Sequence, residues 1–314
     1  MSSIGDTPIN DSFSIGLDMG GTKCAGVLVD GHGTVVATTR LQTPLGANAV
    51  VDALVTSAEE LIEQATGTVV AVGCGVPGLI TTDGVLRFAP HLPGVFELPL
   101  AARLRERLRL PVTVANDNTC AAWGEYVLDR QAKSFLYVGF GTGIGGGFVI
   151  NDQLVTGSDG FAGEIGHMVV DAAGHRCVCG RRGCWEVYAS GSGLALLARE
   201  QGLDLDGPGV RALLRNGEPR AVEVVEQFAR WIALGLTNLI FTLDPDLVVL
   251  GGGAIGLPEE APELIEPILR HLATQFGGSS SHRPMPLIRS AALGPQAGAI
   301  GAARLALEMA RNRS

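Results

Sequence analysis

Short apolar runs separated by glycine turns dominate two stretches of the chain. Residues 15–30 read Ile-Gly-Leu-Asp-Met-Gly-Gly-Thr-Lys-Cys-Ala-Gly-Val-Leu-Val-Asp, and residues 137–151 read Tyr-Val-Gly-Phe-Gly-Thr-Gly-Ile-Gly-Gly-Gly-Phe-Val-Ile-Asn. Each stretch predicts a strand, a glycine turn and a second strand, and further strands at 34–39 and 153–155 extend each into a β-meander. Because the arrangement occurs twice, the pattern predicts two related lobes.

Helical and strand patterns alternate after each meander, which is typical of an α/β fold. The predicted helices are 49–64, 98–108, 221–242, 259–276 and 296–311, and the predicted strands are 68–75, 112–115, 247–250 and 286–289. A chain of 314 residues exceeds the usual size of a single core, so we expect two domains around a shared ligand cleft. The expected division is a small lobe of residues 1–118 with 297–314, and a large lobe of residues 119–296.

Composition and charge exclude several classes of protein. The formal charge of −9 and the lack of clustered Lys and Arg argue against a nucleic-acid partner, because backbone phosphates require such clusters. The apolar run at 69–76 is far shorter than the ~20 residues that cross a membrane. Residues 1–11 show no secretory signal. We therefore expect a cytoplasmic protein with no membrane partner.

The two glycine turns are candidate phosphate sites. Successive backbone N–H groups in such turns can point at phosphate oxygens without obstruction by side chains. Gly20, Gly21, Thr22 and Lys23 form the first turn, and Gly141, Thr142 and Gly143 form the second. Asp18, at the end of its strand, is placed to hold a magnesium ion through water. A single turn of this kind is more often an ordinary hairpin, but the repeat favours two turns that bind one triphosphate.

A dinucleotide-binding site is the competing interpretation of the glycines. The spacing Gly-x-Gly-x-x-Gly occurs from Gly141 and again from Gly251, ending at Gly256. The first copy leads into a strand and lacks the helix N-terminus that binds a pyrophosphate, and no acidic residue ends the strand that follows the second copy. We therefore interpret Gly251, Gly252 and Gly253 as a wall of the adenosine site. The sequence contains no P-loop motif.

A carboxylate follows the predicted strand at 112–115. Ligands bind at the carboxyl ends of strands in open α/β sheets, so Asp117 is a candidate catalytic base with Asn116 beside it. Phosphoryl transfer requires such a carboxylate to accept the proton of the attacking hydroxyl. The alternative is that Asn116, Asp117 and Asn118 only cap the following helix.

A cluster of cysteines predicts a structural zinc site. Cys177, Cys179 and Cys184 lie within eight positions, and either His167 or His175 could complete a tetrahedral set. Free buried thiols are the alternative. A closed site of four ligands would order its loop and thereby present Glu164 and Glu186, whose carboxylates can accept hydrogen bonds from sugar hydroxyls. A metal-bound His167 would keep its second nitrogen for the same purpose.

These motifs together resemble the ROK family of bacterial sugar kinases and sugar-responsive repressors over nearly the whole chain. The matching segments are 18–23, 75–78, 116–117, 139–147, 163–167 and the Cys177-x-Cys-Gly-x-x-Gly-Cys-x-Glu186 signature. The resemblance implies an actin-like, ribonuclease-H-type kinase fold of two lobes, with Asp117 as the base. It also implies zinc on His167, Cys177, Cys179 and Cys184. The implied sugar contacts are Gly75, Asn116, Asp117, Glu164, His167 and Glu186.

The segment Cys184-Trp-Glu-Val-Tyr-Ala-Ser-Gly191 is most similar to the glucokinase branch. That likeness implies ATP- and Mg²⁺-dependent transfer of phosphate to the 6-hydroxyl of glucose, a role in glycolysis, and a homo-oligomer of two or four chains. His91 and Val95 stand where many members carry Asn and Trp beside the sugar, so preference among hexoses is open at this point.

Several rival functions remain from the sequence. Kinases for N-acetylglucosamine, N-acetylmannosamine or fructose differ from a glucokinase by as little as one contact. Polyphosphate could replace ATP as the phosphate donor. A sugar-sensing regulator is disfavoured, because the kinase core begins near Phe13 and leaves no room for an N-terminal helix-turn-helix.

Overall fold

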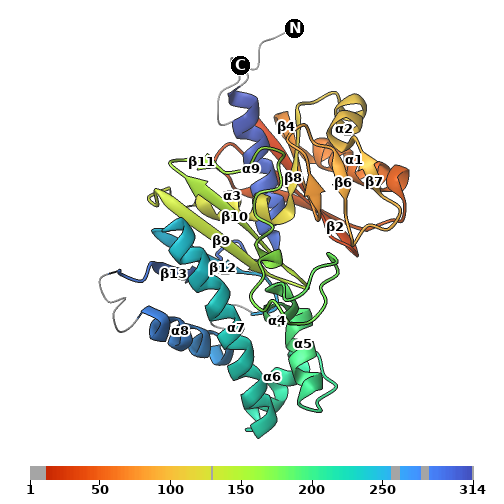
Figure 1. The fold of residues 1–314 in the computed structure, drawn as a ribbon. Helices are drawn as coiled ribbons and strands as arrows, with labels where there is room; N and C mark the ends of the chain where they lie inside the picture. The colour runs from red at the N-terminus through yellow and green to blue at the C-terminus, as the bar shows by residue number, and fades with distance from the viewer. Residues whose placement is uncertain (1–11, 129, 256–261, 277–282, 313–314) are drawn as a thin grey trace. The chain divides into compact units, whose positions relative to one another are not determined.

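The computed structural model describes residues 12–128, 130–255, 262–276 and 283–312, which form two compact units (Figure 1). Unit 1 comprises Met1–Arg130, Gly147–Gly163 and Ala292–Ser314, and unit 2 comprises Gln131–Gly146 and Glu164–Ala291. These bounds differ from the division expected from the sequence, which places everything between 119 and 296 in the large lobe. The difference arises partly because the helix that starts at Asp117 packs along the C-terminal helix of unit 1.

Unit 1 contains a five-stranded sheet with the order β3-β2-β1-β4-β8. Its first three strands are antiparallel, and β4 and β8 run parallel to β1. The strands are β1 Ser12–Met19, β2 Lys23–Val29, β3 Val35–Gln42, β4 Thr68–Val76 and β8 Val112–Asn116. The helices are α1 Ala47–Gln64, α2 Leu100–Leu108, α3 Asp117–Tyr126 and α9 Ala297–Arg311, which the short 3-10 turn Gly294–Gln296 precedes.

The two faces of the unit 1 sheet carry different helices. Ile15 and Leu17 of β1 point into the main core, together with the apolar sides of α1 and α2. The alternate residues of β1 face α9, and Gly16 marks the closest approach. A Cβ atom on Gly16 would lie 1.8 Å from the carbonyl oxygen of Ala299, and one on Gly73 would lie 1.9 Å from that of Ala302. Any larger residue at these two positions would push α9 off the sheet.

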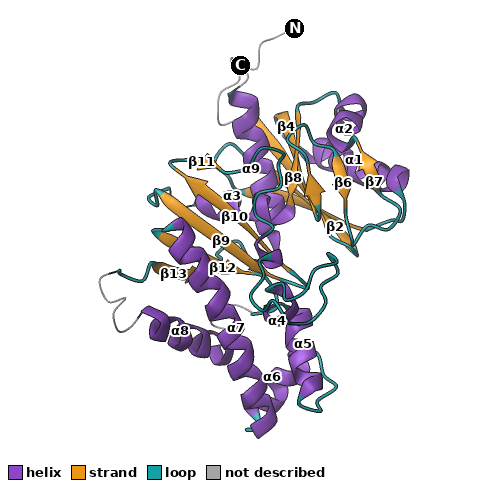
Figure 2. Ribbon diagram, viewed as in Figure 1, coloured by secondary structure: helices purple, strands orange, loops and turns teal. Residues whose placement is uncertain are grey.

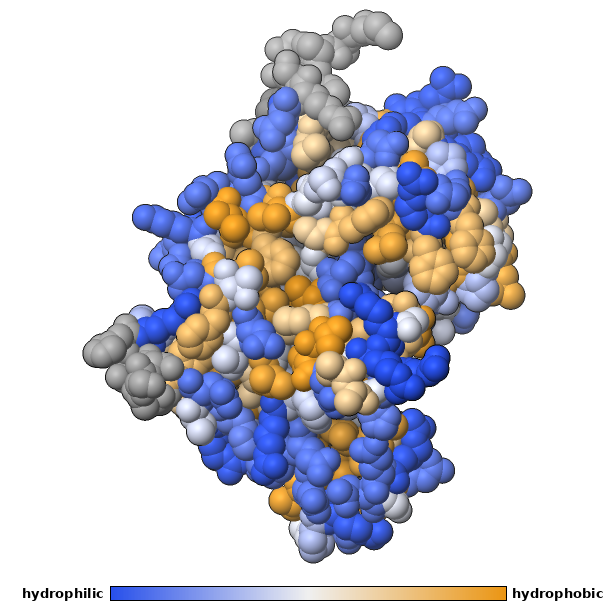
Figure 3. Space-filling model, in the orientation of Figure 1, coloured by the Kyte–Doolittle hydropathy of each residue, from blue (hydrophilic) through white to orange (hydrophobic). Residues whose placement is uncertain are grey.

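A small antiparallel sheet, which the sequence pattern did not predict, is inserted between β4 and α2. Its strands are β5 Leu79–Ile80, β6 Leu86–Phe88 and β7 Phe96–Leu98. Apolar side chains gather on its surface at the upper right of Figure 3. Phe88 and Phe96 are exposed there, with their ring centroids 5.9 Å apart. Strands this short contain too few alternating residues to give a periodic signal.

Unit 2 contains most of a second sheet, whose order β11-β10-β9-β12-β13 repeats that of the first (Figure 2). The matched orders confirm the internal repeat that the glycine turns predict. The boundary between the units falls within β10, after Gly146. The strands are β9 Ser134–Phe140, β10 Ile144–Ile150, β11 Gln153–Leu154, β12 Leu247–Gly251 and β13 Leu287–Ser290. The helices are α4 Glu186–Ala189, α5 Gly191–Glu200, α6 Gly207–Arg215, α7 Pro219–Leu243 and α8 Pro262–Phe276, and a 3-10 turn covers Ile165–His167.

The long predicted helices and buried strands are present, with ends that differ by a few residues. The predicted start of α8 at residue 259 and the glycine at 256 lie outside the described residues. Helices α4, α5 and α6 had no counterpart in the sequence prediction. Among the residues that the structure describes, no helix combines the length and apolar character needed to cross a membrane.

Candidate functional site

In unit 1, the polar residues at the end of β8 divide two tasks between them. Asn116 caps α3: its Oδ1 accepts hydrogen bonds from the backbone N–H groups of Asn118, at 2.8 Å, and Thr119, at 3.3 Å. Its Nδ2 donates to the carbonyl oxygen of Gly78 at 3.2 Å. Because Asn116 supplies the cap, Asp117 is not needed for it. Asp117 Oδ1 accepts a hydrogen bond from the backbone N–H of Asn118, at 2.9 Å, which Asn116 also binds.

The pKa values of Asp117 and Asp18 are both raised, and the charge of Asp117 acts on Asp18. Burial raises the pKa of Asp18 to about 7, and the charge of Asp117 adds to the effect. Burial also raises the pKa of Asp117, while hydrogen bonds from Asn118 and the charge of His91 oppose that rise. Two buried carboxylates, one of which raises the pKa of the other, form a site suited to a cation or a proton.

The first glycine turn lies in the same unit as these carboxylates. The backbone N–H of Gly20 donates to the carbonyl oxygen of Lys23 at 2.8 Å, and the Thr43 hydroxyl donates to the carbonyl oxygen of Gly20 at 2.7 Å. Gly21, Thr22 and Lys23 are exposed. The turn is thus held at its base while its tip faces solvent, as a phosphate-binding turn requires.

His91 joins this group, although its sequence context indicated no role for it. Its Cβ lies 3.1 Å from the position that a Cβ on Gly21 would take, and its charge lowers the pKa of Asp117. His91 therefore lies close to both the phosphate turn and the candidate base. The one feature of the sequence that pointed to His91 was its departure from the family pattern at this position.

In unit 2, part of the second glycine set lines a cavity of about 550 Å³. Gly141, Thr142 and Gly253 contribute from the predicted set. Gly251, Gly252 and Gly143 do not line it. Gly252 has a φ of 93°, and a Cβ there would lie 2.2 Å from the carbonyl oxygen of Phe140, so its role is to allow the close turn. The cavity volume is within the range of about 300–1,000 Å³ found for small-molecule sites.

Helices that the sequence pattern missed complete this cavity. Gly191 and Ser192, at the start of α5, line one side, and the N–H of Gly191 donates to the carbonyl oxygen of Gly141 at 2.8 Å. Pro208 and Arg211 of α6 line another side. Two helix N-termini and an arginine thus border a cavity that also contains a glycine turn, an arrangement that suits a phosphate-bearing ligand.

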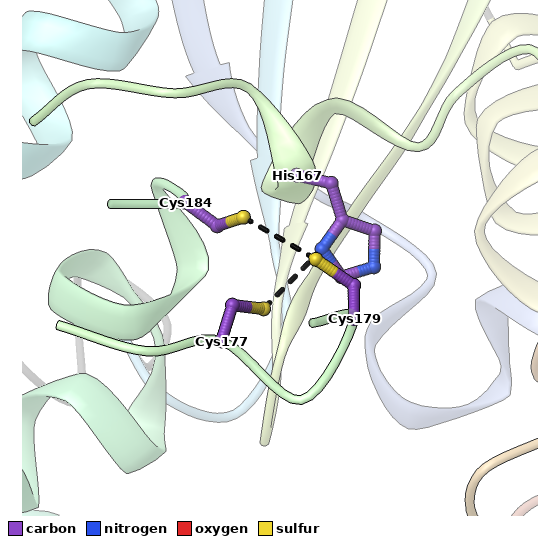
Figure 4. A group of neighbouring side chains, drawn as sticks. All are labelled: His167, Cys177, Cys179 and Cys184. Carbon is purple, nitrogen blue, oxygen red and sulfur yellow. Dashed lines mark hydrogen bonds between the residues drawn. The ribbon is translucent and has the colours of Figure 1, made fainter. Parts of the chain in front are cut away.

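The cysteine cluster is formed as the resemblance implies. The ligand atoms of His167, Cys177, Cys179 and Cys184 all lie within 4.8 Å of one another (Figure 4). Cys179 Sγ lies 3.5 Å from Cys184 Sγ, and Cys177 Sγ lies 3.6 Å from His167 Nδ1. His175 lies elsewhere, with its Nε2 2.9 Å from an oxygen of Glu200. Of the two histidines, His167 is therefore the one beside the thiols.

These separations fit a tetrahedral zinc ion better than the alternatives. Ligands at about 2.3 Å from a tetrahedral zinc stand about 3.7 Å apart, close to the separations observed. A disulfide needs about 2.05 Å between sulfur atoms, and the three cysteines are free thiols. Burial opposes ionisation of Cys179, but hydrogen bonds from the backbone and side chain of Arg181 outweigh it and lower the pKa of that thiol to about 7.

Two acidic residues flank the histidine of the cluster. Glu186 Oε1 lies 3.3 Å from His167 Nδ1, and Glu164 Oε2 lies 3.7 Å from His167 Nε2. The nitrogen Nδ1 faces the thiols, so Nε2 is directed toward Glu164. Glu186 also approaches the second glycine turn, because its Oε2 lies 2.7 Å from the position of a Cβ on Gly143. Unit 2 thus gathers Glu164, His167 and Glu186, as the resemblance implies.

Comparisons with known proteins agree with these features. The model of the ROK family matches residues 14–309. A glucokinase of Streptomyces coelicolor is 34% identical over 94% of this chain and 98% of its own length. An N-acetylmannosamine kinase of Citrobacter koseri is 35% identical over 78% of this chain and 84% of its own.

A solved structure extends the similarity to three dimensions. The ROK-family glucokinase of Streptomyces griseus, crystallised with glucose and AMPPNP, is 34% identical and superposes with a TM-score of 0.81 over 94% of this chain and 99% of its own. The predicted actin-like sugar kinase fold is thereby confirmed, and ATP use and sugar kinase activity are supported. On the extent of the family match and of these likenesses, the chain belongs to the ROK family.

Proposed function

We propose that this chain is a glucokinase that transfers the γ-phosphate of ATP to the 6-hydroxyl of glucose. The observation that carries the proposal is Asp117, a half-buried carboxylate at the end of a strand, which Asn116 relieves of the capping task. The similarity to Streptomyces glucokinases over nearly their whole length supports the choice of glucose.

Asp117 acts as the general base in this proposal. Its carboxylate accepts the proton of the sugar hydroxyl while the hydroxyl oxygen forms a bond to the γ-phosphorus. The bond between that phosphorus and the bridging oxygen of ADP breaks, and ADP leaves with the electron pair. A raised pKa makes Asp117 a stronger base once it is ionised, which favours proton transfer at neutral pH.

Asp18 has a different task, because its pKa of about 7 leaves it partly protonated in the absence of a cation. We assign Asp18 to the magnesium ion, which would offset negative charge on the β and γ oxygens of the nucleotide. The turn from Gly20 to Lys23 presents its exposed tip to the phosphates. The second turn, with Gly141 and Thr142, also serves the phosphates, and the rest of the cavity, bordered by Gly191 and Gly253, takes the adenosine end.

The sugar is bound by the remaining predicted residues. Glu164 and Glu186 accept hydrogen bonds from sugar hydroxyls, and Asn116 and Gly75 contribute from unit 1. The three thiols and the Nδ1 atom of His167 would hold a zinc ion, which would fix the imidazole and leave Nε2 free to meet a further hydroxyl. The zinc site is structural in this proposal, because its four ligands leave no position for a reacting group.

A substrate panel tests the assignment. The purified chain is assayed with ATP and Mg²⁺ against glucose, N-acetylglucosamine, N-acetylmannosamine and fructose, and phosphorus NMR locates the phosphate on each product. We expect the largest kcat/KM for glucose, with phosphate on the 6-hydroxyl. The similarity to N-acetylmannosamine kinases makes that sugar the second candidate, and a larger kcat/KM for it would replace glucose. Polyphosphate in place of ATP tests the donor.

In this proposal the chain acts in the cytoplasm, and its product, a hexose 6-phosphate, enters glycolysis. The expected homo-oligomer is part of the same proposal. Light scattering of the purified protein would give its mass in solution, and a mass near that of a single 32.6 kDa chain would contradict it.

A further inference from the structure

A second, smaller cavity lies in unit 1, and the proposed reaction makes no use of it. Its volume is about 170 Å³. The turn between β2 and β3, the last part of α3 and the C-terminal half of α9 surround it. Helices α3 and α9 run side by side (Figure 1). None of the residues assigned to ATP, magnesium, zinc or the sugar lines this cavity.

Buried polar atoms without a hydrogen-bond partner gather at this cavity. Within the described part of the chain there are three such side-chain atoms, namely Ser14 Oγ, Trp123 Nε1 and Arg304 Nε, and all three residues line it. Ser14 is 1% exposed and Trp123 is 2% exposed. An unpaired buried polar atom costs about 1–3 kcal/mol, so three at one place indicate a missing partner.

The chemistry of these atoms defines that partner. The indole N–H of Trp123 and the Nε–H of Arg304 can only donate hydrogen bonds, and the Ser14 hydroxyl can donate as well. The partner must therefore accept several hydrogen bonds at once. An oxyanion such as phosphate presents several acceptor oxygens on one centre.

The charges around the cavity also favour an anion. Arg304 lies near Arg130, and burial together with the charge of Arg130 lowers the pKa of the Arg304 guanidinium. Glu308 pairs with Arg130, but no carboxylate pairs with Arg304 in the described part of the chain, so an anion in the cavity would offset the repulsion between the two guanidinium groups. Arg130 also lies over the ring of Trp123, 5.5 Å from its centroid.

The acidic side chains that line the cavity are already occupied. Glu308 pairs with Arg130 at 3.0 Å. Asp30 Oδ1 accepts hydrogen bonds from the backbone N–H groups of His32, at 2.9 Å, and Thr34, at 2.8 Å. Arg304 uses one Nη2 hydrogen bond on the carbonyl oxygen of Gly33, at 3.1 Å. Its Nε–H stays available, and the exposed Arg311 adds a further positive charge.

We infer that this cavity is a binding site for a small oxyanion of the phosphate class, held by Ser14, Trp123 and Arg304. The cavity is smaller than the sites of about 300–1,000 Å³ that enclose small organic ligands, so it suits the free ion better than a nucleotide. Ordered water is the competing occupant, because water also accepts hydrogen bonds from buried donors.

The indole N–H of Trp123 offers a direct test. The chain contains three tryptophans, so protein labelled with ¹⁵N-tryptophan gives three indole signals, and Trp123→Phe identifies the signal of interest. Inorganic phosphate is titrated against chloride at constant ionic strength, without nucleotide, magnesium or sugar. We expect a saturable shift of the Trp123 signal with phosphate and none with chloride.

Variants connect that shift to the proposed donors. Ser14→Ala and Arg304→Gln should each weaken phosphate binding at Trp123 about tenfold or more, since each removes a hydrogen bond to a charged ligand. Arg107→Gln, an exposed arginine of the same unit that does not line the cavity, is the matched control. Near-ultraviolet circular dichroism verifies folding, and Ser14→Ala suffices if Arg304→Gln does not fold.

Two results would overturn the inference. A Trp123 signal that does not respond to phosphate means that water fills the cavity and overturns the inference. A response that Ser14→Ala leaves unchanged also overturns it, because the ion then binds elsewhere. The test needs no turnover, so it is independent of the proposed kinase reaction.

Discussion

Asn118 donates two hydrogen bonds to one oxygen of Asp117. Its backbone N–H lies 2.9 Å and its Nδ2 lies 3.0 Å from Asp117 Oδ1. Both bonds stabilise the ionised carboxylate and oppose the effect of burial on its pKa. Asn118 thereby fixes the orientation and adjusts the basicity of the group that we assign as the base.

Replacing the base removes proton transfer. We expect Asp117→Asn to lower kcat by about 10²–10⁴-fold, the usual contribution of a general base. The amide is close in size to the carboxylate, so the melting temperature should fall little or rise. Steady-state assays with glucose and ATP measure kcat, and turnover within twofold of the unchanged protein would exclude Asp117 as the base.

Replacing the partner of the base should shift its titration. Asn118→Ala removes the side-chain hydrogen bond that lowers the pKa of Asp117, so that pKa should rise. The base must be ionised to act, and the acidic limb of the plot of kcat/KM against pH should therefore move to higher pH. A profile that falls uniformly, without moving along the pH axis, would indicate a structural role for Asn118.

Asp18 should make the stability of the ligand-free protein depend on pH. Its folded pKa of about 7 exceeds the value of 3.8 for the free side chain. The folded state therefore binds the proton more tightly, and the free energy of unfolding should decrease as pH rises from about 4 to 7.

Asp18→Asn should weaken this dependence and stabilise the protein above pH 7 by up to about 4 kcal/mol, while the raised pKa of Asp117 maintains part of it. Urea denaturation at several pH values, without magnesium or nucleotide, measures the effect. Asp52→Asn is the control, because Asp52 is exposed and paired with Arg107. If the free energy of unfolding of Asp18→Asn depends on pH as steeply as that of the unchanged protein and of the control, the pKa of Asp18 is not raised in the folded state.

Loss of one thiol should release the metal. Cys179→Ser removes the ligand with the lowest thiol pKa of the cluster, and we expect the bound zinc to fall from one ion per chain to nearly none in elemental analysis. The loop should loosen, and the KM for glucose should rise more than the KM for ATP. Cys24→Ala, a buried cysteine of β2 outside the cluster, should keep its zinc. Native protein without zinc would refute the site.

Filling the unit 2 cavity should weaken the binding of the nucleotide but not that of the sugar. Ala195→Phe places a ring in the cavity that we assign to adenosine, and we expect the KM for ATP to rise by about tenfold or more with little change for glucose. Arg199→Ala on the same helix does not line the cavity and should leave both constants unchanged. A selective rise in the KM for glucose would place the sugar there.

The sequence predicted the fold best where periodicity extends over many residues. The predicted helix at 221–242 and the strand at 247–250 correspond closely to α7 and β12. Helices α5 and α6 are short, and glycine is the first residue of both, so propensity gave little sign of them. Their N-termini are what border the cavity in unit 2.

The candidate site was predictable where a motif specifies chemistry at fixed spacing. The thiols of Cys177, Cys179 and Cys184 are close together because a short loop forces them to be. His91 was not assigned, because its approach to Gly21 depends on the irregular loop between β6 and β7. Contacts that depend on such loops leave no periodic trace in a sequence.

Helix α9 can pack on the first sheet only after both sheets have been synthesised. The face of that sheet that carries Gly16 and Gly73 is covered by α9, which follows every described strand in the chain. A ribosome must therefore synthesise the second sheet before that face of the first can be closed. The nascent chain would expose an apolar surface during this interval, and chaperones could recognise it until α9 emerges.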